Sequence, residues 1–241
     1  MSTWRWWEVI GVVILGYILG GIASIPVFLI LGNTTTNGAS GVSELSQTLV
    51  SDLVLLGVLV YWLRSRHPEW PAAIGFPPRN RWGREVALGS GLGLAVRLVA
   101  AIASVVVISI LQTTGGAGNT TLPNQVSSNL SAGALIVFAL VAVVVAPVTE
   151  ELVFRGLLFR TLRDRHSLVV AWIVSAVLFG LVHFVPDNDW RGVVALQVTM
   201  MITGFGLAMI YEFRKNLLAN IAGHAIFNLL AVIAIATHVL K

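Results

Sequence analysis

Residues 132–156 read AGALIVFALVAVVVAPVTEELVFRG, an apolar run that ends in two adjacent carboxylates. The 18 residues 132–149 carry no ionisable side chain and come close to the length of about 20 residues that a membrane-spanning helix needs. Glu150 and Glu151 follow directly, although a charge at the bilayer centre costs about 2.5–3.5 kcal/mol. The stretch therefore predicts a transmembrane helix whose acidic side chains have a functional role.

The chain as a whole is also strongly apolar. Hydrophobic residues make up 56% of its 241 residues and charged residues 11%, against about 25% charged in an average soluble domain. The apolar stretches are 9–31, 47–63, 85–112, 132–149, 167–185, 192–212 and 217–240. This composition excludes a soluble single domain and a disordered chain. It predicts an all-α, polytopic transmembrane helical bundle of about seven helices, or eight if 185–191 holds a further one. The chain has no cysteine, which excludes disulfides, thiolate metal ligands and a cysteine nucleophile.

The basic residues predict the orientation of the bundle. Twelve of the fifteen Lys and Arg residues fall in alternate connections: Arg5, Arg64, Arg66, Arg79, Arg81, Arg84, Arg155, Arg160, Arg163, Arg165, Arg214 and Lys215. Two of the opposite connections, 32–46 and 113–131, contain neither residue type. The positive-inside rule then places the N-terminus in the cytoplasm and the C-terminus outside. Because these basic residues are spread along the membrane surface, we expect the lipid bilayer as their partner and no nucleic acid.

Two side chains of the first acidic motif are predicted to pair with each other. Glu151 and Arg155 are four residues apart and share one face of a helix. A buried glutamate that pairs with an arginine stays ionised and is mainly structural. Glu150 points about 100° away from Glu151, so the arginine satisfies it less well. Glu150 is therefore the better candidate for a general base.

Two further polar motifs interrupt the later apolar stretches. His183 ends the motif FGLVH at 179–183, near the end of the fifth stretch. His224 and Asn228 bound the motif HAIFN at 224–228, and their spacing of four residues puts both on one helix face. Ionisable residues inside membrane segments typically mark functional sites, so these motifs are candidates for the same site as the glutamates.

Counting along a helical hairpin predicts that Glu150 and His183 meet. Glu150 lies 16 residues before His166, at the expected turn, and His183 lies 17 residues after it. At about 1.5 Å per residue these separations are about 24 and 26 Å, so both side chains reach the same depth. His224 lies nine residues, or about 14 Å, beyond Lys215. We expect a site inside the membrane, nearer the cytoplasmic face, with a cavity that opens toward the cytoplasm.

The three motifs in this order are Glu-Glu-x-x-x-Arg, Phe-x-x-x-His and His-x-x-x-Asn, and they resemble the CPBP family. This is a family of Abi-like intramembrane proteases that includes the type II CAAX prenyl endopeptidases. The resemblance covers residues 132–232. It implies a catalytic transmembrane core at 131–241, preceded at 1–130 by N-terminal transmembrane helices with a cytoplasmic linker at 65–84.

The resemblance also implies roles for the motif residues. In the family, a water molecule cleaves the peptide bond. By similarity, Glu150 and His183 would activate this water, and His224 and Asn228 would stabilise the oxyanion. A carboxylate in a low-dielectric pocket suits a general base, and a preorganised His and Asn suit an oxyanion hole. No Gly-x-Ser-x-Gly nucleophile elbow is present in the sequence.

A metal ion is left open by the sequence. Glu150, His183 and His224 could hold zinc as two histidines and a glutamate. The histidines do not form a His-Glu-x-x-His array, and asparagine is a poor zinc ligand, so the residue pattern favours a metal-free mechanism. No cofactor is required by the pattern.

The substrate implied by the resemblance is a membrane-embedded or lipidated protein or peptide. Eukaryotic members of the family remove three residues after a prenylated cysteine, and bacterial relatives are more varied. The short chain without a targeting extension favours a prokaryotic plasma membrane. Two alternatives stay open: a small transporter, since intramembrane Glu and His also mark proton pathways, and a non-proteolytic adaptor or immunity protein of the same fold.

Overall fold

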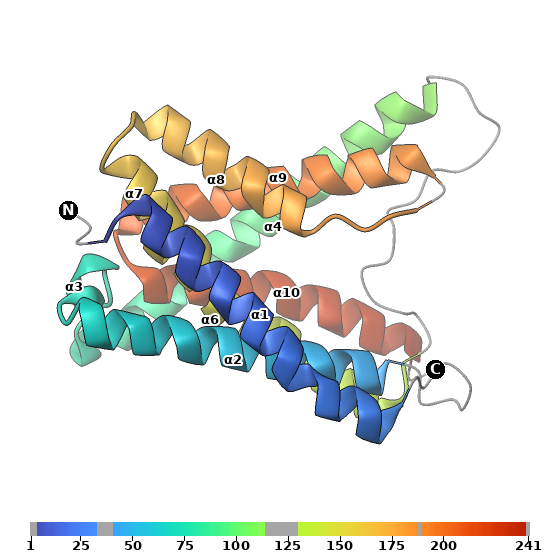
Figure 1. The fold of residues 1–241 in the computed structure, drawn as a ribbon. Coiled ribbons are helices and arrows are strands. Elements are labelled where there is room, and N and C mark those ends of the chain that lie inside the picture. The colour runs from blue at the N-terminus through green and yellow to red at the C-terminus, as the bar shows by residue number, and fades with distance from the viewer. Residues whose placement is uncertain (1–3, 33–40, 114–129, 188, 240–241) are drawn as a thin grey trace.

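The computed structural model describes residues 4–32, 41–113, 130–187 and 189–239. Within these ranges every regular element is a helix (Figure 1). Six helical runs are long and apolar enough to cross a membrane: Trp6–Leu31, Val42–Arg66, Arg79–Thr113, Ala132–Arg163, Trp190–Arg214 and Leu217–Thr237. A shorter apolar helix, Leu168–Val182, accompanies them. The predicted all-α, polytopic helical bundle is thus confirmed for the part of the chain that the structure describes, and the protein is an integral membrane protein.

The helices run back and forth along one direction (Figure 1). They are α1 (Trp6–Leu31), α2 (Val42–Arg66), α3 (Trp70–Ala73), α4 (Trp82–Thr113), α5 (Ala132–Leu140), α6 (Ala146–Glu151), α7 (Arg160–Arg163), α8 (Leu168–Val182), α9 (Trp190–Arg214) and α10 (Leu217–Val239). One end of the bundle, on the left in Figure 1, holds the last turn of α2, residues 67–81, α7 and the turn between α9 and α10. We call it the basic end, because it carries most of the basic residues expected in the cytoplasm. Much of the predicted connection 113–131 lies outside the described residues.

Glycines let two pairs of helices approach closely. On α1, a Cβ added at Gly16 would lie 2.4 Å from the Leu55 side chain of α2, and one at Gly20 would lie 2.8 Å from the Ser51 carbonyl oxygen. On α4, a Cβ at Gly93 would lie 2.1 Å from the Gly223 carbonyl oxygen of α10. At Gly20 and Gly93 a larger residue would require the backbones to move, and at Gly16 the Leu55 side chain would have to shift. Small residues four apart on α1 and α4 therefore set the packing of both helix pairs, as expected for membrane helices.

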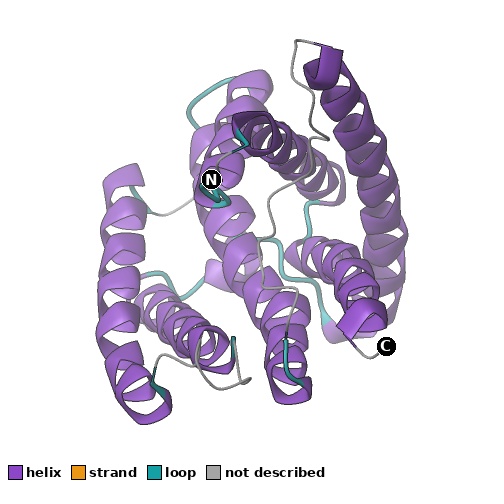
Figure 2. Cartoon of the chain, turned by 90° about the vertical axis from the view of Figure 1, so that its right-hand side faces the viewer, coloured by secondary structure: helices purple, strands orange, loops and turns teal. Residues whose placement is uncertain are grey.

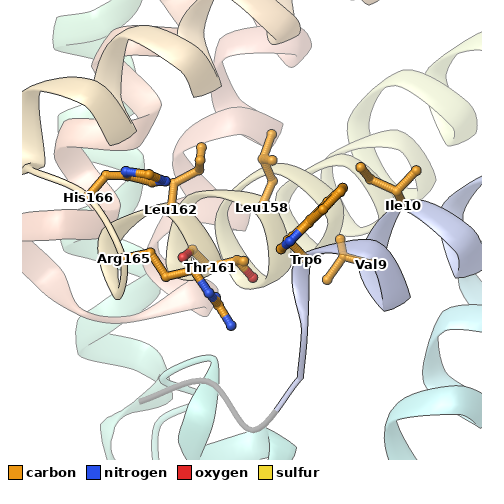
Figure 3. Close-up of a pocket in the computed structure, with 8 residues that line it drawn as sticks. All are labelled: Trp6, Val9, Ile10, Leu158, Thr161, Leu162, Arg165 and His166. Carbon is orange, nitrogen blue, oxygen red and sulfur yellow. Dashed lines mark hydrogen bonds between the residues drawn. The ribbon is translucent and has the colours of Figure 1, made fainter.

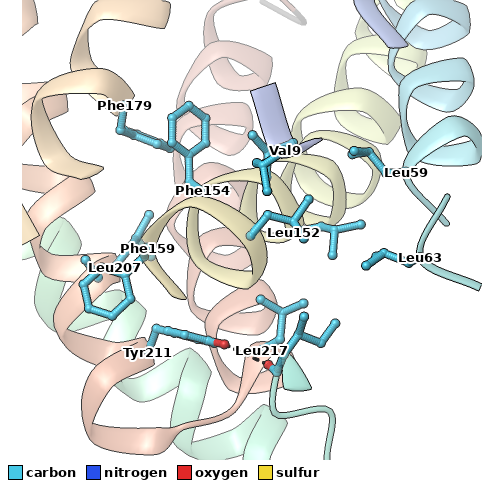
Figure 4. Close-up of a cluster of buried hydrophobic side chains, with 14 of the residues drawn as sticks. Val9, Leu59, Leu63, Leu152, Phe154, Phe159, Phe179, Leu207, Tyr211 and Leu217 are labelled. Atoms are coloured by element: carbon cyan, nitrogen blue, oxygen red, sulfur yellow. Dashed lines mark hydrogen bonds between the residues drawn. The ribbon is translucent and has the colours of Figure 1, made fainter. Parts of the chain in front are cut away.

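The fourth membrane-crossing run is helical throughout but not uniformly α-helical. Two π-helical turns, η3 (Val141–Val145) and η4 (Leu152–Phe159), flank α6, which carries both glutamates. A π-turn inserts one extra residue per turn and frequently occurs at a functional site. Figure 4 shows the apolar side chains of η4 packed among residues from α1, α2, α8, α9 and α10. This packing fixes the height and rotation of α6.

The fifth apolar stretch forms a short helix that stops inside the bundle. α8 has 15 residues, which gives a length of about 22 Å against a hydrocarbon core of about 30 Å. Its C-cap is His183, and the chain then continues without regular structure toward the start of α9 (Figure 1). No further helix lies between 183 and 187. The early end of α8 places His183 in the interior of the bundle instead of at its surface.

Part of the predicted linker 65–84 packs onto the core. Ile74 is fully buried, and its carbonyl oxygen accepts a hydrogen bond of 3.0 Å from the Tyr211 hydroxyl of α9 (Figure 4). Gly75 has a φ of 73°, and a Cβ there would lie 2.2 Å from the Lys215 carbonyl oxygen. The left-handed conformation and the close contact both require glycine. The linker therefore closes the basic end of the helix bundle.

Candidate active site

Three of the predicted site residues converge from three different helices. Glu150 comes from the end of α6, His183 from the C-cap of α8 and His224 from α10. The Oε2 atom of Glu150 lies 3.7 Å from Nε2 of His183 and 3.9 Å from Nε2 of His224. The equal depths that were counted along the hairpin therefore correspond to a close approach in space.

Glu151 lies on the other side of His224 and is completely buried. Its Oε1 atom accepts from Nη1 of Arg155 at 3.0 Å and lies 2.8 Å from Nδ1 of His224. Its Oε2 atom accepts from the amide nitrogen of Asn220. Three donors thus surround one carboxylate, which explains how a buried charge is tolerated here. The predicted pair of Glu151 and Arg155 is present in the structure.

Arg155 extends the same network to two other helices. Its Nη2 atom donates to the carbonyl oxygen of Gly204 on α9 at 2.9 Å, and its guanidinium lies 4.6 Å from the centre of the Phe179 ring on α8. The side chain is fully buried. With these contacts Arg155 links η4, α8 and α9 around the glutamates, which is a structural task and involves no exposed atom.

Both histidines are anchored at Nδ1 and turned toward Glu150 at Nε2. Nδ1 of His183 donates to the carbonyl oxygen of Phe179 at 2.8 Å, and Nδ1 of His224 faces the Glu151 carboxylate. A hydrogen bond at one ring nitrogen fixes the tautomer and orientation of an imidazole and leaves the other nitrogen for chemistry. The two Nε2 atoms are therefore the reactive ones.

The space between Glu150 and the two histidines suits a water molecule. Distances of 3.7 and 3.9 Å exceed a hydrogen bond, and Oε2 of Glu150 has no hydrogen-bond partner among the described residues. Glu150 is 25% exposed and His183 21%, whereas His224 is 4% exposed. An unpaired carboxylate oxygen beside two imidazole rings is where a bridging water is favoured. The site is thus open on the side of Glu150 and His183.

Asn228 lies one turn beyond His224 on the same face of α10. Its Nδ2 atom donates to the carbonyl oxygen of Ala142 in η3 at 2.8 Å. The amide group has two N–H donors, so one remains for another acceptor. The π-turn thereby holds Asn228 beside the cluster without using its full donor capacity.

The fit of a metal ion can be judged from the donor groups. Within the described ranges, no three His, Cys, Asp or Glu side chains are arranged so that they could hold a metal ion. The nitrogen and oxygen atoms named above are chemically suitable for zinc, but their arrangement as it stands does not form such a group. The steps proposed below therefore use only the chain's own residues.

Sequence reasoning gave no role to two polar residues that the structure places in this region. Asn220 is completely buried and holds Glu151, and it lies one turn before His224 on α10. Asp52, on α2, is half-buried inside the membrane segment and interacts electrostatically with Glu150. Asp52 was detectable by the criterion that found the glutamates, because it is a charge inside an apolar stretch.

A cavity of 280 Å³ lies elsewhere, between α1 and α7 (Figure 3). Its lining is mostly apolar and includes Trp6, Ile10, Leu158 and Leu162, with Arg165 and His166 at the basic end. None of the predicted site residues lines it. We assign the chemistry to the polar cluster instead, because hydrolysis needs groups that transfer protons and stabilise charge.

The described residues define a polytopic helical membrane protein whose interior holds a glutamate between two histidines, next to a buried Glu–Arg pair. Residues 132–230 match the family model described as Type II CAAX prenyl endopeptidase Rce1-like. The matched segment contains every predicted site residue from Glu150 to Asn228. The resemblance to the CPBP family that the three motifs predicted is therefore confirmed for this segment.

A curated relative covers a similar region. The Bacillus subtilis (strain 168) protein named Putative membrane peptidase YdiL is 32% identical over 94 residues. The match spans 39% of this chain and 35% of the relative, so it covers about a third of the relative's length. No solved structure matches the chain significantly.

Proposed function

We propose that the protein is an intramembrane endopeptidase that hydrolyses peptide bonds of membrane-associated or lipidated proteins. The observation that carries this proposal is the convergence of Glu150, His183 and His224 in the bundle interior, where Oε2 of Glu150 has no hydrogen-bond partner among the described residues. The family match over 132–230 and the name of the Bacillus relative support the same reaction class.

In the proposed first step, water attacks the scissile carbonyl carbon. Glu150 takes one proton from the water at Oε2, and His183 orients the water through Nε2. These two atoms lie 3.7 Å apart. The hydroxyl oxygen bonds to the carbonyl carbon, and the carbonyl oxygen becomes an oxyanion. General base catalysis of this kind contributes about 10²–10⁴-fold to the rate.

In the proposed second step, the tetrahedral intermediate collapses. His224, as imidazolium, donates from Nε2 to the oxyanion while its Nδ1 donates to Glu151, and Asn228 donates through its remaining N–H. The C–N bond then breaks, and the leaving amine takes the proton that Glu150 had accepted. The products are a new carboxyl terminus and a new amino terminus.

The membrane geometry supports a substrate that enters from the lipid. The exposed side of the cluster is formed by Glu150 and His183, and α8 ends at His183 before it has crossed the bilayer. The clustering of basic residues at one end supports the proposed orientation, with the N-terminus in the cytoplasm, the C-terminus outside and the site opening toward the cytoplasm. A prokaryotic plasma membrane is the proposed location, and a lipidated or membrane-embedded peptide the proposed partner.

A cleavage assay with purified protein tests the proposal. The probe is a peptide with a farnesylated cysteine followed by three apolar residues, reconstituted with the protein in nanodiscs and analysed by mass spectrometry. We expect cleavage by the wild type and a loss of about 10²–10⁴-fold in kcat for Glu150→Gln and His183→Ala. The matched controls Glu69→Gln and His166→Ala change exposed residues outside the cluster and are expected to cleave normally. Normal cleavage by folded Glu150→Gln would refute the assignment.

A further inference from the structure

Arg97 is a basic residue in the middle of a membrane-crossing helix. It lies 15 residues after the start of α4 at Trp82 and 16 before its end at Thr113, or about 22 and 24 Å from the two ends. An extended arginine side chain spans only about 7 Å, given bond lengths of about 1.5 Å. Its guanidinium therefore reaches neither end of α4.

Arg97 is half-buried and has no acidic partner in the described part of the chain. It makes no hydrogen bond or ion pair there, and its recorded contact is with an aromatic ring: the guanidinium lies 4.8 Å from the centre of the Phe227 ring on α10. An unpaired charge at this depth is unfavourable, and such residues typically face the protein interior or a substrate path. Among the residues that the structure describes, no anion therefore pairs with this cation in the membrane segment.

The position of Phe227 places this cation next to the candidate active site. Phe227 is three residues after His224, which puts it about 60° around α10 and about 4.5 Å further from the basic end. It is adjacent in sequence to Asn228, which donates to the Ala142 carbonyl oxygen of η3. Phe227 therefore lies at the border between the catalytic face of α10 and the face that packs on α4.

The two helices separate just beyond this point. α4 and α10 are in close contact at Gly93 and Gly223, one turn before Arg97 and Phe227 respectively. In Figure 1 their later turns diverge toward the end opposite the basic end, and Figure 2 views the bundle from that end. Arg97 lies one turn beyond this contact and is half-exposed, so a ligand group can approach its guanidinium there.

We propose that Arg97 forms a subsite for a carboxylate of the peptide substrate; this rests on the peptidase function proposed above. An extended peptide rises about 3.3 Å per residue, so an anion bound beside Phe227 lies about one to three residues from the scissile bond. The terminal carboxylate of a short tail fits this place best, because a longer chain would bring more unpaired backbone groups into the membrane. Arg97 would select substrates that end shortly after the cleaved bond.

The test compares farnesylated peptides with three apolar residues after the cysteine that end in either a free acid or an amide. The wild type is expected to cleave the acid with a kcat/KM about 10- to 100-fold higher, because a charge-assisted hydrogen bond is lost with the amide. Arg97→Gln is expected to cleave both equally, with the effect mainly in KM. Arg97→Lys should keep part of the preference, and the exposed control Arg79→Gln all of it.

A second pair of peptides separates two sources of the carboxylate. Both end in an amide, and the last residue is either Glu or Gln. A preference of the wild type for Glu that Arg97→Gln abolishes would assign the subsite to an acidic side chain. A preference for the free acid over the amide assigns it to the terminal carboxylate. Either result supports a carboxylate subsite. If Arg97→Gln does not fold, the test uses inhibition of the wild type by the tripeptide that cleavage releases. The tripeptide with a free carboxyl terminus should then inhibit at least about 10-fold better than the same tripeptide with an amide.

The results that overturn this proposal differ from those that overturn the peptidase function. Cleavage of acid and amide with equal kcat/KM by the wild type, or a preference that folded Arg97→Gln retains, would exclude the subsite while leaving the peptidase in place. An equal loss for both peptides in Arg97→Gln would make Arg97 a purely structural residue. A wild type that cleaves neither peptide nor any lipidated variant contradicts the function itself.

Discussion

The buried ion pair of Glu151 and Arg155 leads to a quantitative prediction for stability. Both side chains are 0% exposed, and Nη1 and Oε1 are 3.0 Å apart. Glu151→Gln removes the negative charge and leaves Arg155 in the bundle interior without a counter-ion. Breaking a buried pair in this way costs about 3–5 kcal/mol, so we expect the free energy of unfolding to fall by that amount.

The same substitution is expected to lower the activity of molecules that stay folded. Glu151 faces donors from Arg155, Asn220 and His224. Glutamine has one acceptor oxygen and a donating NH₂ group, so at least one of these donors would face another donor. Even where the glutamine oxygen still accepts from Nδ1 of His224, this hydrogen bond no longer involves a carboxylate charge and is weaker, so Nε2 is held less firmly toward the oxyanion.

A double-mutant cycle with Arg155→Met measures the pair directly. The double variant contains no unpaired charge, so we expect it to lose at least about 2 kcal/mol less than the sum of the two single losses. The control Asp164→Asn changes a partly exposed pair with a separation of 4.0 Å and is expected to lose less than about 1 kcal/mol. Unfolding is followed by tryptophan fluorescence in micelles of increasing dodecyl sulfate content. Additive single losses, or a loss below about 1 kcal/mol for Glu151→Gln, would refute the reasoning.

Three further predictions follow from the same geometry. Asn228→Ala removes an oxyanion donor, so kcat should fall about 10²–10³-fold with little change in KM; a rise in KM alone would speak against this role. Gly93→Ala places a Cβ 2.1 Å from the Gly223 carbonyl oxygen and should destabilise the bundle by about 1–3 kcal/mol, whereas Gly91→Ala, with no atom within 4 Å, should be neutral in the same unfolding assay. A metal-free mechanism predicts that 1,10-phenanthroline leaves cleavage unchanged; inhibition that added zinc reverses would instead assign a metal to the cluster.

Much of the candidate site was predictable because helices convert residue counts into distances. The spacing of four between Glu151 and Arg155 predicted their pairing, and the hairpin count predicted that Glu150 and His183 reach one depth. Both relations depend only on the rise and twist of a helix. The span count was predictable for the same reason, since long apolar stretches leave few structures other than helices in a membrane.

Other features depend on contacts between helices that no local pattern encodes. Asn220 reaches Glu151 across 69 residues of chain, so its partner follows only from how α6 faces α10. The π-turns η3 and η4 shift the phase of the helix by single residues, which hydrophobic periodicity does not resolve. The burial of Ile74 depends on its fit against the turn between α9 and α10. The division into 1–130 and 131–241 and the roles of the site residues stay predictions.

The central claim is that Glu150, His183, His224 and Asn228 act together on one scissile bond. It is tested most directly by a structure of the protein bound to a substrate peptide whose scissile bond is replaced by a phosphinate, a mimic of the tetrahedral intermediate. The account predicts one phosphinate oxygen within hydrogen-bond distance of Glu150 Oε2 and the other facing His224 Nε2 and Asn228 Nδ2. A phosphinate bound away from these atoms, with Glu150 and His183 touching neither oxygen, would contradict it.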